Sequence, residues 1–470
     1  MRFRQSLSHL LRGIALVVAA SCVACGGGGG GGSSVAPVAS PDAAVVAAVA
    51  ANSTPLATID PSAATSDADL AAFGTAVGDR RIVLLTEATH GDGATFELKT
   101  RLVKYLHESK GFDVLFIESG LYDVARMQQR VAAGGESISA QAPGRIFYMY
   151  SRTDAGQLVL RYVDSTRATA APLALWGHDV PMDGADSTQQ LLPDLQAFLA
   201  ARESPSLQSA DWPGWLRVAQ QGVALDASPL ASADADSFLA LSPQLSAELC
   251  ADADTPGEVL QSPAFWCRIV DDIHADYTHL FSATDPRTPT DLRDAAGAAN
   301  IRWLLDGRLG GQKAIVWLHA VHGIDGWVAP SSCADAASQE CGPGFVNVGT
   351  ALTQAYGDQV YIVDVAAGSG VFDTYDTIHA CGAPTAGYPL ALPGPTGLEY
   401  YLAAGGQPRF MAWPVDAAAR QAIAPLSVSE DEFRLHRPSD FGSGYQGLFF
   451  LPTLAPTTVD CTAWPVLSYS

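Results

Sequence analysis

The sequence predicts an α/β protein with a mainly parallel sheet and flanking helices. Short apolar runs of strand length recur along the chain, and segments with apolar residues at helical spacing lie between them. Parallel strands need such crossover connections, which bring the carboxyl ends of the strands to one edge of the sheet. Ligands of open α/β sheets bind outside that edge, so polar residues that follow the strands are candidates for function.

Six apolar runs are predicted to be strands, at 82–85, 113–117, 172–176, 313–318, 359–363 and 448–451. Helical spacing is clearest at 66–77, 96–106, 122–132 and 291–305. Between about 187 and 310 the chain is rich in alanine and is predicted to be mostly helical, as an insertion in one large α/β domain. We place this domain at 66–470.

The first 25 residues have the pattern of an export signal. Arg2, Arg4 and Arg12 precede an apolar run at 14–20, which is too short to span a bilayer. Cys25 is followed by seven glycines, and this junction resembles the lipoprotein signal of Gram-negative bacteria. We therefore expect an exported protein of the periplasm or outer membrane, lipidated at Cys25 and touching the membrane only through that anchor.

Cys22 is an alternative lipidation site, and an ordinary cleaved signal peptide is the other interpretation of this stretch. The Gly/Ser/Ala/Pro-rich segment 26–65 is predicted to be a flexible tether.

Charge and cysteine content limit the partners. The formal charge of −22 becomes about −25 without the three signal arginines, and nucleic acid needs a basic surface, so no nucleic-acid partner is expected. A small-molecule substrate is expected instead, and the protein is expected to be a monomer. Six cysteines remain in an exported chain, which favours three disulfides. The short-range pairings are Cys250–Cys267 and Cys333–Cys341, which leave Cys381 with Cys461.

Ionisable side chains follow four of the predicted strands, and this convergence indicates an enzyme. They are Glu87 with His90, Glu118, His178 with Asp179, and His319 with His322. A histidine with a pKa near neutrality is a natural general base for activating water, and carboxylates beside it orient the ring. His178 and Asp179 are placed at the rim of this site.

Other catalytic motifs are absent from the sequence. It has no Gly-x-Ser-x-Gly elbow and no phosphate-binding Gly-x-x-x-x-Gly-Lys-[Ser/Thr], and Gly442 to Gly447 is interpreted as a loop. A cofactor-free site is expected. A divalent metal stays open, because all five residues Glu87, His90, Glu118, His319 and His322 are competent ligands.

Several motifs resemble those of the erythromycin esterase family. The first is Thr86-Glu87-Ala88-Thr89-His90-Gly91, with Phe96 to Lys99 and a strand that ends at Glu118. Later matches, in the same order as in the family, are Arg293-Asp294, Asn300 to Trp303, Val316 to His322, Gly349 to Leu352, Tyr356 to Asp358 and Tyr445 to Phe450.

The resemblance implies an α/β hydrolase that cleaves an ester or lactone without a metal. By position, His90 would be the general base, with Glu87 and Glu118 as its carboxylate partners and Lys99 bracing them. His319 and His322 would stabilise the oxyanion or hold substrate. Arg293 and Trp327 are further candidates for support or substrate binding.

Two departures from the family pattern concern substrate choice. Thr86 replaces the usual glycine before Glu87, and Ala320 replaces the usual asparagine after the first late histidine. Two other functions stay open at this point. One is a metal- or haem-binding surface lipoprotein of a related fold, and the other is a metal-dependent hydrolase.

Overall fold

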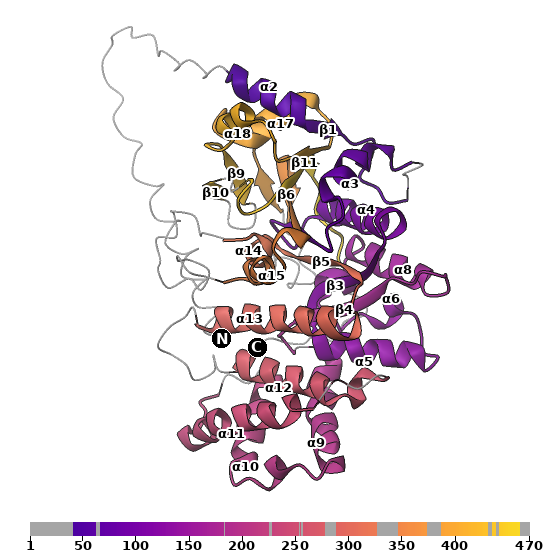
Figure 1. Cartoon of the computed structure of the whole chain (residues 1–470), viewed down its shortest axis with the longest axis vertical. Helices are drawn as coiled ribbons and strands as arrows, with labels where there is room; N and C mark the ends of the chain where they lie inside the picture. The colour runs from indigo at the N-terminus through magenta and orange to yellow at the C-terminus, as the bar shows by residue number, and fades with distance from the viewer. Residues whose placement is uncertain are drawn as a thin grey trace, which may run out of the picture.

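One central sheet organises the chain, with helices on both of its faces and a group of helices beyond one end (Figure 1). The computed structural model describes residues 41–62, 66–182, 184–224, 228–252, 254, 257–277, 288–326, 346–373, 387–430, 435–438 and 441–460. Within these ranges the sheet has nine strands, in the order β1-β8-β11-β6-β2-β5-β3-β4, and β7 pairs with β6. The α/β architecture that the sequence predicts is confirmed.

The six predicted strands are present and pair in parallel. They are β2 (Ile82–Glu87), β3 (Phe112–Gly120), β4 (Ala174–Asp179), β5 (Lys313–His319), β6 (Val360–Phe372) and β11 (Gly447–Leu454). Sequence patterns missed the antiparallel strands β1 (Ser53–Pro55), β7 (Tyr388–Leu390), β8 (Arg409–Ala412), β9 (Ser427–Glu430) and β10 (Leu435–Pro438). These have three or four residues each, too few to display an alternating pattern.

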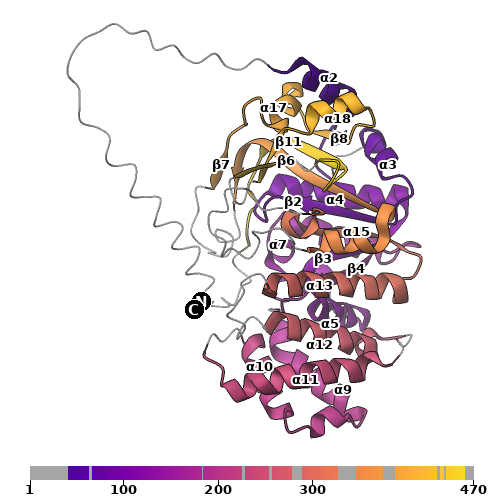
Figure 2. The same cartoon turned by 60° about the vertical axis from the view of Figure 1, so that its left-hand side comes forward.

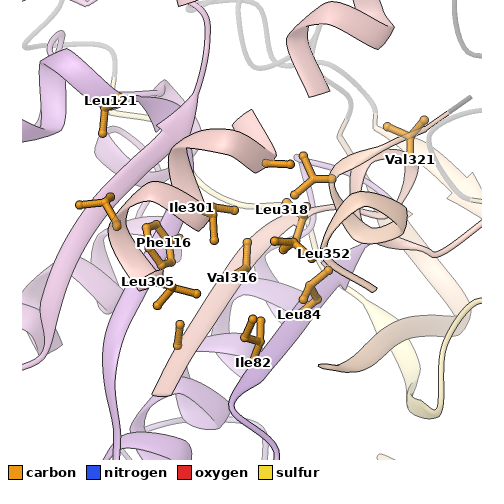
Figure 3. Packing of buried hydrophobic residues seen from close by; sticks show 14 of the residues in the cluster. Ile82, Leu84, Phe116, Leu121, Ile301, Leu305, Val316, Leu318, Val321 and Leu352 are labelled. Carbon is orange, nitrogen blue, oxygen red and sulfur yellow. The ribbon is translucent and has the colours of Figure 1, made fainter. Parts of the chain in front are cut away.

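Alternate residues of the central strands face opposite layers of helices, as the period of two in a strand requires. Ile82 and Leu84 of β2 pack with Val316 of β5 and with Ile301 and Leu352 from the helices of one face (Figure 3). Their neighbours in sequence face the other layer. The first layer contains α13 (Thr288–Trp303), α14 (Ala320–Gly323) and α15 (Val348–Tyr356), and the second contains α3 (Ala71–Val77), α4 (Gly93–Lys110) and α8 (Gly156–Thr166).

The predicted helical insertion forms the lower part of the molecule in Figures 1 and 2. It contains α9 (Leu192–Ala201), α10 (Trp212–Val223), α11 (Ser232–Cys250) and α12 (Pro263–Tyr277). Cys250 and Cys267 form a disulfide that links α11 to α12. Cys333, Cys341, Cys381 and Cys461 lie outside the described residues. The insertion ends in α13, which returns to the sheet and packs against β4 and α15.

Five further α-helices of the described residues complete the fold. They are α5 (Leu121–Ala132), α6 (Ile138–Gln141), α7 (Tyr148–Ser151), α17 (Leu398–Leu402) and α18 (Ala417–Ile423).

The predicted tether 26–65 is wrong for its second half, because α2 (Ala43–Asn52) and β1 belong to the fold. Asp42 caps α2 by accepting hydrogen bonds from the backbone N–H groups of Ala44 and Val45. Val45, Ala48 and Val49 are buried, and α2 packs against α17 and α18. An alanine-rich helix and a low-complexity tether have similar compositions, and packing decides between them.

Residues 1–40, including the expected signal and Cys25, lie outside the described ranges. Among the described helices, none is long and apolar enough to cross a membrane.

Candidate active site

The polar residues that follow the parallel strands meet at one edge of the sheet. β5 lies between β2 and β3, so Glu87 at the end of β2 is in register with His319 at the end of β5. Glu118 extends from β3 on the other side of β5, and Asp179 ends the neighbouring strand β4. Four segments far apart in sequence thus bring ionisable side chains together, as their positions predict.

Lys99 and His90 contact the two oxygens of the Glu87 carboxylate. The Lys99 ammonium, from α4, contacts Oε2, and His90 Nδ1 lies 3.4 Å from Oε1. Glu87 and Lys99 have no solvent exposure. Burial lowers the pKa of Lys99 well below its ordinary value, against the opposing charges of Glu118 and Asp364. The Lys99 ammonium also lies 4.4 Å from the centre of the Trp317 ring, a cation–π contact.

The turn that carries His90 is fixed by backbone contacts on both sides. Gly91 pairs with Asp373 at the end of β6, and a Cβ at position 91 would overlap the Asp373 carbonyl oxygen. Asp92 caps α4 by accepting from the N–H groups of Ala94 and Thr95, each at 3.1 Å. Burial raises the pKa of Asp92 to about 6, despite these hydrogen bonds. The glycine and the cap together hold His90 between the strand and the helix.

Glu118 lies at the centre of the site. Its Oε2 accepts a hydrogen bond from the His319 backbone N–H at 2.7 Å. Its Oε1 faces three nitrogens: Nε2 of His90 at 3.9 Å, Nε2 of His322 at 3.9 Å and Nη2 of Arg293 at 3.6 Å. Burial would raise the pKa of Glu118, but the positive charges of His90, His322 and Arg293 outweigh burial and hold this pKa below its ordinary value. Glu118 is therefore a carboxylate at neutral pH.

His322 is paired with an acid from α13. Its Nδ1 lies 2.8 and 3.0 Å from the two oxygens of Asp294, so Nδ1 carries a proton and donates it. Burial lowers the pKa of His322, but the Asp294 carboxylate more than compensates, and the net shift is upward. Asp294 also accepts from the Val348 N–H at 3.2 Å, which ties α13 to the start of α15.

His319 caps the short helix α14. Its Nδ1 accepts from the Val321 N–H at 3.2 Å, so in the neutral ring the proton is on Nε2. The rings of His319 and His90 meet edge to face, with their centres 4.9 Å apart. Phe147 contacts His90 in the same way, with ring centres 5.4 Å apart. His90 is thus held between an imidazole and an aromatic ring.

Arg293 connects the ends of β3 and β4. It binds Asp179 through two hydrogen bonds of 2.9 and 2.6 Å and also faces Glu118. Burial raises the pKa of Asp179, but Arg293 outweighs it, so the net shift is downward and this pair is ionised.

His178 differs from these residues. Within the described part of the chain, neither ring nitrogen has a hydrogen-bond partner. Burial lowers the pKa of His178, although the Asp179 and Glu118 charges oppose this shift.

The structure therefore brings together all the predicted site residues that it describes. His178 lies among them, but its ring makes no hydrogen bond within the described part of the chain. Trp327 lies outside the described residues. Sequence patterns missed the role of Asp294, although it directly follows Arg293 in a matched motif, and they missed Tyr150, whose hydroxyl contacts the Glu118 backbone. Asp364, which accepts from Thr86 Oγ1 at 2.7 Å, also belongs to the surroundings of this site.

Among the described residues, the site does not bring any three metal-ligand atoms close together. Among the described residues, the group whose ligand atoms all lie within 4.8 Å of one another is Cys250, Cys267 and Asp271, and its two sulfurs form the disulfide. At the site, imidazoles and carboxylates approach one another in pairs, such as His90 and Glu118 at 3.9 Å, but the described residues there do not bring three ligand atoms within 4.8 Å of one another.

A family model for erythromycin esterase matches residues 107–437, about 70% of the sequence. The chain belongs to the erythromycin esterase family. A protein of Bacillus subtilis (strain 168), YbfO, whose assignment as a hydrolase is itself a prediction, is 47% identical over 58 residues. That match covers 12% of this chain and 13% of the relative. Family membership and this relative support a hydrolase.

Solved structures support the same fold for this member of the erythromycin esterase family. A protein from Bacillus cereus has a TM-score of 0.68 at 19% identity, and a succinoglycan biosynthesis protein has 0.67 at 15%; each match covers 88% of this chain and 98% of the other. A mutant of erythromycin esterase EreC in its open conformation has 0.59 at 14% identity, over 86% of this chain and 97% of that one. At these identities the likeness concerns the fold alone.

Proposed function

We propose that this chain hydrolyses an ester or lactone of a small molecule by direct attack of a water molecule, with His90 as the general base. The observation that carries the proposal is the arrangement of carboxylates around His90. Glu87 lies at Nδ1 and Glu118 lies beyond Nε2, at 3.4 and 3.9 Å. One carboxylate can orient the ring while the other nitrogen stays available to take a proton.

The spacing around Glu118 suits a bound water molecule. A separation of 3.9 Å is too long for a direct hydrogen bond, but two atoms at that distance can share a water molecule between them. A water molecule between His90 Nε2 and Glu118 Oε1 would be oriented by the carboxylate and deprotonated by the imidazole.

Cationic groups lie where negative charge would develop. His322, whose pKa is raised by Asp294, would present Nε2–H as a donor beside Glu118, and Arg293 lies next to it. His319 presents its own Nε2–H when neutral. Donors held in place before the reaction stabilise an oxyanion strongly, because they need not reorganise in the transition state.

The proposed reaction proceeds in two steps. The water oxygen bonds to the carbonyl carbon, its proton moves to His90 Nε2, and the carbonyl electrons move to the oxygen, near His322 and Arg293. The carbon–oxygen bond of the ester then breaks, and the departing alkoxide takes the proton back from His90. The products are a carboxylic acid and an alcohol, and the chain itself supplies every proton transfer.

The proposal is for cofactor-free chemistry in a monomer. We also keep export and lipidation at Cys25 as proposals, supported by the basic and apolar pattern of the first 25 residues.

The test is a panel of aryl esters, alkyl esters and lactones with the wild type and two histidine variants. His90→Gln removes the base and should lower kcat by about 10²- to 10⁴-fold, with an unchanged melting temperature. His107→Gln is the control, because His107 is a buried histidine bonded to Tyr162 outside the site, and it should keep wild-type rates. Full activity in His90→Gln would refute the mechanism.

A further inference from the structure

The pairing between β3 and β5 stops one residue before Glu118. In this parallel pair Phe116 lies opposite Val316 and Ile117 opposite Trp317. If the ladder continued with Glu118 opposite Leu318, the Glu118 N–H would donate to the Trp317 carbonyl and the His319 N–H to the Glu118 carbonyl. Buried backbone groups need partners, so the place where this ladder ends must satisfy them in another way.

The hydroxyl of Tyr150 takes the place of the first of these bonds. It accepts from the Glu118 N–H at 3.3 Å and donates to the Trp317 carbonyl at 3.3 Å. Tyr150, on α7, is fully buried, and its ring packs between Trp317 and Phe96, with centres 5.7 and 6.1 Å away. Burial raises the pKa of Tyr150 well above its ordinary value, so the hydroxyl keeps its proton and can donate.

The side chain of Glu118 takes the place of the second bond. Its Oε2 accepts the His319 N–H at 2.7 Å, where a regular ladder would offer the Glu118 backbone carbonyl. The carboxylate can reach this donor because the strands separate at this residue. Its other oxygen, Oε1, is then directed toward His90, His322 and Arg293.

We infer that Tyr150 is a positioning residue. Its hydroxyl separates the ends of β3 and β5, so that the Glu118 carboxylate, instead of its backbone, lies against β5 and faces the two histidines. The consequence for catalysis rests on the proposed function. The geometric consequence, the placement of Glu118 beside His322, does not depend on it.

The experiment compares Tyr150→Phe with the control Tyr105→Phe. Both remove one hydroxyl from a buried tyrosine, but Tyr105 lies on α4 against Phe73, outside the site. The first readout is the titration of His322, monitored by nitrogen NMR of protein that contains labelled histidine. The His322 signal is identified as the one that is missing from His322→Gln. Glu118 is one of the charges that raise the pKa of His322, so this titration should move to lower pH in Tyr150→Phe alone.

The second readout is hydrolysis of the best ester of the panel. We expect kcat to fall by about 100-fold in Tyr150→Phe, because a displacement of about 1 Å in a catalytic group has an effect of that size. KM should change little, and Tyr105→Phe should keep both values. An unchanged His322 titration together with unchanged kcat in folded Tyr150→Phe would overturn the inference.

Two further outcomes are distinguishable. If the wild type cleaves nothing in the panel, the proposed function fails, while the His322 titration still decides the role of Tyr150. If Tyr150→Phe does not fold, p-aminophenylalanine at position 150 supplies a group that both donates and accepts. That variant should titrate as the wild type does, and a His322 titration displaced to lower pH in the folded protein would overturn the inference.

Discussion

Replacing Asp294 with asparagine tests the charge state on which the proposed oxyanion site depends. Asp294 holds His322 Nδ1 at 2.8 and 3.0 Å, and its Oδ2 also accepts from the Val348 N–H. Asparagine has nearly the same shape but no charge, and it has one acceptor oxygen in place of two. If that oxygen keeps His322, the amide NH₂ group meets the Val348 N–H, and a buried donor loses its partner.

The size of the effect follows from these contacts. A hydrogen bond to a charged group contributes about 1.5–3 kcal/mol and an orphaned buried donor costs about 1–3 kcal/mol, so we expect a loss of roughly 2.5–6 kcal/mol in the free energy of unfolding at pH 5.5. His322 has a folded-state pKa above its ordinary value, so its stabilisation is fully present below about pH 6.5 and is lost as pH rises through the folded pKa. At pH 9 only the neutral part of the loss should remain.

Urea unfolding at both pH values measures this difference, with Asp69→Asn as the matched control. Asp69 likewise accepts from a cation, Arg101, and from a backbone N–H, that of Ala57. Arginine does not titrate in this range, so the loss in Asp69→Asn should be equal at pH 5.5 and 9. In Asp294→Asn the alkaline limb of the pH–rate profile should also move to lower pH. Equal losses at both pH values, with an unmoved limb, would refute our assignment of His322 as a cation.

Three other changes have definite expected outcomes. Thr86→Val keeps the shape of the side chain but removes the hydroxyl that donates to Asp364, so it should lower the free energy of unfolding by about 1–3 kcal/mol, measured by thermal unfolding. Thr86→Ser keeps the hydroxyl and should lose less than Thr86→Val in the same measurement. Replacing both Cys250 and Cys267 by alanine should cost about 2–4 kcal/mol in urea and leave kcat unchanged, because the disulfide lies in the helical part; a fall in kcat would contradict that separation. Dialysis against EDTA, checked by elemental analysis, should leave ester hydrolysis within about twofold of the untreated protein, since the ligand atoms at the site do not converge; loss of activity that zinc restores would show a metal-dependent hydrolase instead.

The centre of this site was predictable because strand geometry places it. A parallel sheet brings the carboxyl ends of its strands to one edge, so apolar runs that end in Glu87, Glu118 and His319 place these residues on that edge. Short-range spacing supplied His90 and His322, each three residues from another candidate. Strand direction alone predicts this shared edge; that the three residues also meet depends on β2, β5 and β3 being neighbours in the sheet.

Partners on helices were not predictable in the same way. Asp294 meets His322 only because α13, after a long helical excursion, packs between β4 and α15. Tyr150 reaches the sheet from a four-residue helix whose sequence has no visible period. The fold of residues 42–55 escaped prediction for a related reason, because the apolar face of an alanine-rich helix becomes apparent only when its packing partner is known.

The strand order also explains how one histidine can have two carboxylates near it. Because β5 separates β2 from β3, the backbones that carry Glu87 and Glu118 lie two strand spacings apart, about 10 Å. Each carboxylate has its own basic partner: Lys99 for Glu87, and Arg293 for Glu118. The two acids therefore need not share a proton, as adjacent carboxylates often must. Glu87 at Nδ1 can orient His90 while Glu118, beyond Nε2, can orient a water molecule, and neither acid can substitute for the other.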